Sequence, residues 1–349
     1  MLRRVLLLAV AVVFSLAVAD FATVEDVRSL LKEGEGLASA EVAALEAQLE
    51  EDPLDLSART RLLGYYGDRT RYREPASRAR IASLLLWLIH NEPKSEILGT
   101  RSMRIWGLDA YENPDAYVEA KRALLAHLEE EPNDPNLLRY ATDLLGMQDR
   151  PLAIELLERA KSLDSADVNV ARTLAYMYYW QGRRGLKGPN LEAARKAVDE
   201  YDRILELDSE TSSKSYLKYA AEAALIVSDF EKAGGYAHLM LGDARPDSPD
   251  YGDQFHIGNI TLGKVALAQG DVQGAASYLL LAGSTPGSTQ LKYSGPDTEL
   301  AKQLLEEGEQ ESVLRYLDQC ASFWERGQGK LREWAILVRA GQVPSFRRY

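Results

Sequence analysis

The sequence predicts an all-α protein, a solenoid of stacked antiparallel helix pairs. The main observation is a ladder of small or apolar residues spaced by four and then three, which places them on one helical face. Turn-forming residues such as Glu92-Pro93, Glu131-Pro132 and Pro286-Gly287 lie between copies. A repeat of roughly 34 residues is typical of stacked helical hairpins. The copies, the fifth being the loosest, are Ala82-Leu86-Ile89, Ala120-Leu124-His127, Ala153-Leu157-Ala160, Ala197-Tyr201-Ile204, Ala233-Ala237-Met240, Ala275-Leu279-Ala282 and Val313-Leu317-Cys320.

Residues 1–19 have the features of an export signal. Arg3 and Arg4 precede an almost wholly apolar stretch, and Ala17-Val18-Ala19 forms a small-x-small cleavage site before Asp20. The apolar stretch is shorter than the ~20 residues that span a bilayer, although a retained anchor is the alternative. We therefore expect an exported protein, periplasmic or extracellular, with no stable membrane insertion after cleavage.

The repeat region, residues 54–322, is predicted to contain about seven helical hairpins. Its clearest copy runs from His256 to Pro286, where Gly270-Asp271 separates a first helix from a second. Small residues at Gly263 and Ala275 would let these two helices approach closely. No single hairpin buries its own apolar face, so neighbouring hairpins must stack. The alternative is an all-helical domain without regular stacking of its helices.

Both ends of the repeat region are predicted to be capped. In residues 20–53 we expect two amphipathic helices, at about 23–33 and 39–51, parted by Gly34 and Gly36. In residues 323–349 we expect a closing helix at about 329–340 and then a tail. Terminal repeats need such covers because one of their faces has no neighbour.

This pattern resembles the tetratricopeptide repeat family over about residues 54–322. The resemblance implies a right-handed superhelix in which the first helix of each hairpin lines a concave surface that binds partners. The last hundred residues are also similar to the C-terminal module of a group of functionally uncharacterised bacterial tetratricopeptide repeat proteins. That second likeness implies the fold but no activity. The residues that carry it include Gly258-Asn259, Leu262-Gly263, Thr285-Pro286-Gly287-Ser288, Gly295-Pro296, Leu300-Ala301, Gly308-Glu309 and Phe323-Trp324.

The composition argues against a nucleic-acid or anionic-membrane partner. The formal net charge is -12, and loss of Arg3 and Arg4 with the signal would make it -14. A local run of arginines between 59 and 80, interleaved with Tyr65, Tyr66 and Tyr72, is interpreted as pairing with acidic residues of the neighbouring repeat or with a negatively charged peptide. The single cysteine, Cys320, falls on the ladder and is predicted to be a small buried hydrophobe.

No pattern in the sequence indicates catalysis. The histidines His90, His127, His238 and His256 show no metal-ligand spacing, and no phosphate-binding glycine loop or nucleophile elbow is found. We therefore predict no cofactor, no metal and no enzymatic activity. The alternative, an envelope hydrolase with a small active site on the solenoid, requires a close carboxylate pair or Ser–His pair within a pocket.

A partner would contact the exposed face of the first helices. Arginine and lysine there would hold the carboxylates of an extended peptide, and tyrosine would add apolar contact. The alternative is that these charges are ordinary surface ion pairs. Together these observations predict a non-catalytic scaffold or adaptor of the bacterial cell envelope that binds a protein or peptide. The predicted contacts are Arg139, Asp143, Asn169, Arg172, Tyr176, Tyr179, Lys218, Lys264 and Lys302, with Trp180 and Glu222 nearby.

Overall fold

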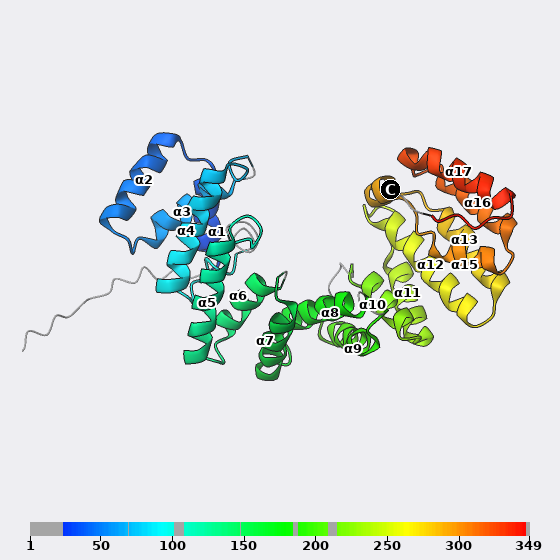
Figure 1. Ribbon diagram of the computed structural model, residues 1–349, viewed down its shortest axis with the longest axis horizontal. Helices are drawn as coiled ribbons and strands as arrows, with labels where there is room; N and C mark the ends of the chain where they lie inside the picture. Colours follow the sequence, from blue (N-terminus) through cyan, green and yellow to red (C-terminus); the bar gives the residue numbers. More distant parts are fainter. Residues whose placement is uncertain are drawn as a thin grey trace, which may run out of the picture. The chain divides into compact units, whose positions relative to one another are not determined.

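A computed structural model describes residues 24–68, 70–100, 108–146, 148–183, 188–208 and 215–346 (Figure 1). The predicted signal segment lies outside the described residues. Within these ranges the chain forms 17 α-helices and no strand, so the prediction of an all-α protein is confirmed. None of the described helices is long and apolar enough to cross a bilayer.

The chain divides into two compact units, Met1–Leu156 and Leu157–Tyr349, and the division falls within α7. The first six helices are α1 (Val24–Glu35), α2 (Ser39–Glu51), α3 (Leu56–Gly67), α4 (Pro75–Asn91), α5 (Pro114–Glu130) and α6 (Pro135–Leu145). Then follow α7 (Arg150–Leu163), α8 (Val168–Arg183), α9 (Leu191–Leu207), α10 (Leu217–Ile226), α11 (Phe230–Asp243) and α12 (Tyr251–Ala268). The last are α13 (Val272–Gly283), α14 (Thr289–Ser294), α15 (Glu299–Glu306), α16 (Gln310–Cys320), a 3-10 turn η1 (Glu325–Gly327) and α17 (Gln328–Arg339).

In the first unit, α3 is the central helix. It packs against α1, α2 and α4. Further along the chain, α4 contacts α5 and α5 contacts α6. The predicted helices at about 23–33 and 39–51 correspond to α1 and α2, and both cover α3. The fully buried Leu62 and Leu63 of α3 meet a core to which α4 contributes Leu84, Leu85 and Leu88.

In the second unit, the helices pack as neighbouring antiparallel pairs. The pairs are α8 with α9, α10 with α11, α12 with α13, and α15 with α16. The first helices of these pairs also contact one another in succession, α8 with α10, α10 with α12, and α12 with α15. The second helix of a pair also contacts the first helix of the following pair, as α9 contacts α10.

The ladder faces the interior, as predicted. Its first residue is at most 5% exposed in all seven copies, from Ala82 to Val313. Most of the second and third residues are also buried, whereas Leu86, His127 and Ala160 are partly exposed. The spacing therefore marks the faces on which the helices pack.

The predicted helix break at Gly270-Asp271 is confirmed. Gly270 has a φ of 83°, a left-handed conformation that suits glycine at the end of a helix. The Asp271 side chain then accepts a hydrogen bond from the backbone N–H of Gly274 and caps α13. The close approach expected at Gly263 is also present, because a Cβ there would lie 2.3 Å from Leu300 Cδ2 and 3.3 Å from the Ala275 carbonyl oxygen.

The closing helix is α17, and it covers the last pair through Trp334, which is 2% exposed. The Trp334 ring packs 5.7 Å from that of Trp324 and 5.2 Å from that of Phe346. Cys320 of α16 is fully buried, and burial raises the pKa of its thiol. The interpretation of Cys320 as a small buried hydrophobe is therefore confirmed.

Candidate functional site

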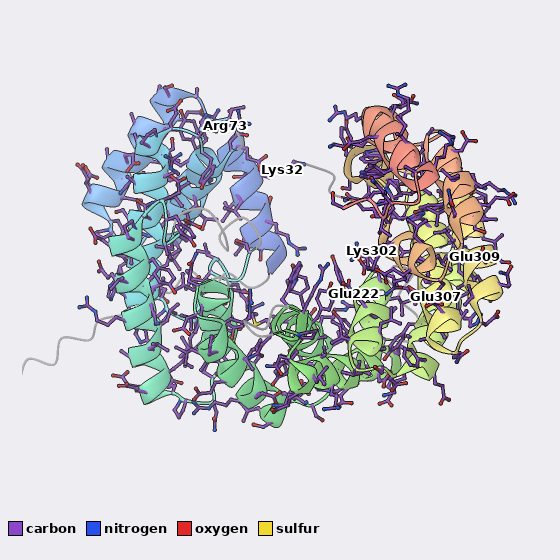
Figure 2. All side chains as sticks on the ribbon, turned by 45° about the vertical axis from the view of Figure 1, so that its right-hand side comes forward. Lys32, Arg73, Glu222, Lys302, Glu307 and Glu309 are labelled. Carbon is purple, nitrogen blue, oxygen red and sulfur yellow. The ribbon has the colours of Figure 1, made fainter. Side chains whose placement is uncertain are left out.

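The predicted contact residues fall in both units. Arg139 and Asp143 lie on α6 of the first unit. The others lie on four successive first helices of the second unit, with Asn169, Arg172, Tyr176 and Tyr179 on α8, Lys218 on α10, Lys264 on α12 and Lys302 on α15. Figure 2 shows Glu222 of α10 and Lys302 of α15 on the same side of the second unit, away from Glu309.

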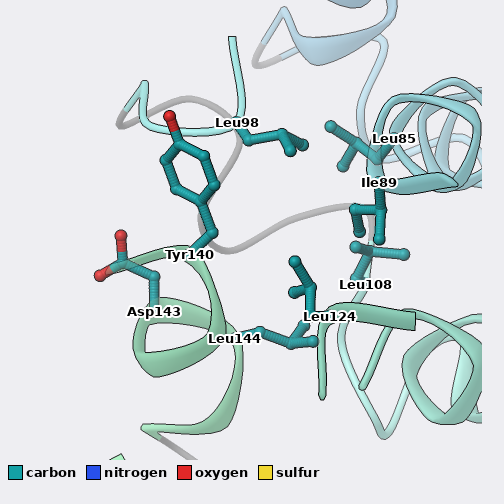
Figure 3. Close-up of a pocket in the computed structure, with 8 residues that line it drawn as sticks. All are labelled: Leu85, Ile89, Leu98, Leu108, Leu124, Tyr140, Asp143 and Leu144. Atoms are coloured by element: carbon teal, nitrogen blue, oxygen red, sulfur yellow. The ribbon is translucent and has the colours of Figure 1, made fainter. Parts of the chain in front are cut away.

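On α6, Arg139 is held by its neighbours. Its Nη2 donates to Glu96 Oε2 at 3.1 Å, to Asn136 Oδ1 at 3.2 Å and to the Tyr140 hydroxyl at 3.1 Å. Asp143 lies one turn further on and lines a small, mainly apolar pocket with Tyr140 (Figure 3). The opposite wall of this pocket comes from Leu85 and Ile89 of α4. Arg139 is thus committed to internal contacts.

On α8 and α10 the structure assembles an aromatic cluster, which we define as Tyr176, Tyr179, Trp180 and Tyr219. The ring centroid of Tyr176 lies 6.0 Å from that of Trp180 and 5.9 Å from that of Tyr219. The Tyr179 centroid lies 5.3 Å from Trp180 and 5.1 Å from Tyr219. Edge-to-face and tilted pairs at these distances stabilise one another beyond the area that they bury.

Members of the aromatic cluster differ in their access to solvent. Tyr176 is 47% exposed, Trp180 and Tyr219 are partly exposed, and Tyr179 is only 1% exposed. The buried Tyr179 hydroxyl donates to Glu222 Oε2 at 2.6 Å. Burial, and then this hydrogen bond, raise the pKa of Tyr179. Tyr179 is therefore the buried member of the aromatic cluster, and Tyr176 is the member most accessible to a partner.

Basic side chains surround the aromatic cluster. Lys218 Nζ lies 4.9 Å from the Tyr219 ring centroid, and the Arg183 guanidinium lies 5.6 Å from the Trp180 ring centroid while Arg183 Nε pairs with Glu222 at 3.0 Å. Arg172 forms an ion pair with Asp208, and both its side chain and that of Asp208 are partly buried.

The remaining predicted cations lie on α12 and α15. Lys264 Nζ is 3.4 Å from Asp297 Oδ2, with only 21% of the Lys264 side chain exposed, whereas Lys302 is exposed. Asn169 is also exposed, at the beginning of α8. Three of the predicted cations, Arg139, Arg172 and Lys264, are thus engaged in ion pairs, as the alternative of ordinary surface pairing requires.

Sequence reasoning missed Tyr219 and Arg183. Arg183 lies four residues after Tyr179, on the same face of the helix, whereas Tyr219 is adjacent to Lys218 and therefore does not share its face. The contact between Tyr219 and the α8 rings depends on how α8 and α10 pack, which spacing along one helix does not contain.

Among the described residues, no group of three or more histidine, cysteine, aspartate or glutamate side chains is placed to hold a metal ion. No protein-family model matches the chain, and no curated protein matches it significantly.

Proposed function

We propose that this protein is a non-catalytic scaffold or adaptor of tetratricopeptide repeat type, exported to the bacterial cell envelope, which binds a protein or an extended peptide. The packing of α8 to α16 as neighbouring helix pairs with small residues inside supports the repeat assignment. The basic, apolar and small-residue pattern of residues 1–19 supports export.

The observation that carries the binding proposal is the half-exposed aromatic cluster beside Lys218 and Arg183. Aromatic residues and arginine are enriched at the centres of protein interfaces. Tyr176 has only two side-chain torsions to fix, so its contact costs little conformational entropy on binding. Its 47% exposure leaves apolar area that a partner would cover.

The charges indicate which peptide fits. Lys218 is not paired with any carboxylate in the described part of the chain, and it lies directly against the Tyr219 ring. A peptide with an acidic side chain next to an apolar one would satisfy Lys218 and cover Tyr176 at the same time. The proposed partner segment is therefore acidic and amphipathic.

The experiment selects peptides from a random display library on the purified chain and measures their affinity by isothermal titration calorimetry. Peptides with Asp or Glu beside an apolar residue should be enriched, and Tyr176→Ala/Lys218→Ala should bind them at least tenfold more weakly, a loss of about 1.4 kcal/mol. The matched control is Lys292→Ala/Tyr293→Ala, which removes an exposed Tyr–Lys pair from α14. Equal loss in both variants would refute the assignment of this surface.

Export is tested separately by N-terminal sequencing of the protein recovered from its native cell envelope. The proposal expects the mature chain to begin at Asp20, and a chain that retains Met1 argues for an anchor or for an intracellular protein.

A further inference from the structure

A cavity in the first unit contains an arginine that forms no ion pair with a carboxylate among the residues that the structure describes. It is lined by α2, α3 and α4 and has a volume of about 380 Å³, within the usual range of small-molecule sites. Arg59 of α3 is the buried member, only 5% exposed. The lining residues are Glu46, Leu49, Glu50, Pro53, Arg59, Arg80, Ser83 and Trp87.

The contacts of Arg59 leave part of its guanidinium unsatisfied. Its Nη2 donates to the Pro53 carbonyl oxygen at 2.7 Å, and its guanidinium carbon lies 3.6 Å above the centre of the Trp87 ring. Its Nε is buried and has no hydrogen-bond partner within the described ranges of the chain. Buried charges in proteins are normally paired, because desolvation of an unpaired ion is costly.

The acidic side chain that acts most strongly on Arg59 is Glu46, which also binds other partners. Glu46 accepts a hydrogen bond from Arg80 Nε at 2.8 Å and one from the Tyr66 hydroxyl at 2.9 Å, and it forms an ion pair with Arg80. Burial, and then repulsion from Arg80, lower the pKa of Arg59 to about 10. Glu46 and Asp55 offset this effect only in part, and among the described residues neither forms with Arg59 the direct ion pair that Glu46 forms with Arg80.

Three other arginines of the same basic run, Arg61, Arg78 and Arg80, have carboxylate partners, whereas Arg71 and Arg73 form no such pair among the described residues. Arg61 pairs with Glu33 at 3.1 Å, and Arg78 pairs with Glu112 at 3.3 Å. Part of the run thus pairs with acidic residues inside the chain, namely Glu33 of α1, Glu46 of α2 and Glu112 before α5. Among the arginines of this run that the structure describes, Arg59 is the most buried.

We propose that this cavity binds a small monocarboxylate with an apolar body, whose carboxylate accepts hydrogen bonds from Arg59. Guanidinium groups match carboxylate geometry, and Leu49, Pro53 and Trp87 offer apolar wall to the rest of the ligand. The charges that line the cavity, two arginines and two glutamates, cancel. A single negative charge is therefore favoured over a doubly charged phosphate. This site is independent of the α8–α10 surface.

The test measures thermal unfolding and calorimetric binding of the purified chain with a panel of aromatic and aliphatic monocarboxylates that includes benzoate. At a concentration ten times its dissociation constant, a bound carboxylate should raise the unfolding temperature by about 2–4 °C. Benzamide, the neutral analogue of benzoate, should give no shift, and phenyl phosphate should give a smaller one. No shift with any carboxylate, or a larger one with phenyl phosphate, overturns the proposal.

Two variants locate the site. Arg59→Leu should abolish the shift, whereas Arg61→Leu, which removes the same charge from the same helix, should keep it. If Arg59→Leu does not fold, Ser83→Glu provides the second test, since its new carboxylate enters the cavity wall and should weaken binding at least tenfold. Binding that persists unchanged in Ser83→Glu, or in a folded Arg59→Leu, overturns the proposal.

Discussion

The backbones of α1 and α3 touch at Gly34 and Gly64. A Cβ atom on Gly34 would lie 2.0 Å from the Arg61 carbonyl oxygen and 3.0 Å from Gly64 Cα. A Cβ atom on Gly64 would lie 2.0 Å from the Leu31 carbonyl oxygen. Since the obstacles are backbone atoms, no side-chain rotation relieves these contacts. Glycine at both positions thus permits the crossing that joins the N-terminal cap to the first hairpin.

Gly64→Ala should destabilise the first unit. The added methyl group forces α1 and α3 apart, and overpacking of this kind costs roughly 1–3 kcal/mol, more than the ~1 kcal/mol that alanine gains over glycine in helix propensity. We expect a net loss of about 1–2 kcal/mol in the free energy of unfolding, measured by urea denaturation.

Gly234→Ala is the matched control. A Cβ at Gly234 meets nothing within 4 Å, so only the gain in helix propensity remains. This variant should stabilise α11 by about 0.5–1 kcal/mol. Equal effects of the two substitutions would contradict a close α1–α3 crossing.

The ion pair between Lys121 and Asp149 should make stability depend on acid pH. Lys121 Nζ donates to Asp149 Oδ2 at 2.8 Å, and this hydrogen bond lowers the pKa of Asp149. A carboxyl whose pKa is lower in the folded state contributes stability above its unfolded pKa of about 3.9, and the contribution is lost as the pH falls through the folded pKa.

Asp149→Asn removes the charge and keeps an oxygen that can accept from the Leu152 N–H. Wild type should be the more stable of the two at pH 6, and its advantage should shrink as the pH falls from 4 towards 2. Denaturation curves of both proteins across that range provide the measurement, and a difference that does not change with pH would count against the pair.

His256 should be a structural residue. It is 1% exposed, its Nε2 accepts a hydrogen bond from the Asp297 N–H at 3.0 Å, and its Nδ1 therefore carries the proton donated to the Ala282 carbonyl oxygen at 3.0 Å. His256→Ala removes both bonds and leaves a cavity beside the Tyr316 ring, at a cost of about 2–4 kcal/mol. A variant that unfolds at the same urea concentration as wild type would show that these bonds contribute nothing.

Cys320 should be unreactive in the folded chain. It is fully buried with a raised thiol pKa, and only the thiolate attacks disulfide reagents. A colorimetric disulfide reagent should therefore report about one thiol per chain rapidly in denaturant and only slowly without it. Rapid reaction without denaturant would place Cys320 at an accessible position.

The helix pairs could be predicted from the sequence because buried residues recur at helical spacing. Ala275, Leu279 and Ala282 are separated by four and then three residues, as on one face of a helix, and all three are fully buried. The candidate site was only partly predictable. The ion pair of Arg172 with Asp208 and the meeting of Tyr219 with Tyr176 join different helices, so they depend on packing that periodicity within one helix does not encode. Arg59 likewise looks the same in sequence as Arg61, although only Arg59 is buried.

The central claim is that the partner binds to the face formed by the first helices α8 and α10. Hydrogen–deuterium exchange with a selected acidic peptide tests this claim most directly. We predict slower exchange of the backbone amide hydrogens in residues 168–183 and 217–226 when the peptide is bound. Protection confined to the second helices α9 and α11, or no protection in the second unit at a saturating peptide concentration, would contradict it.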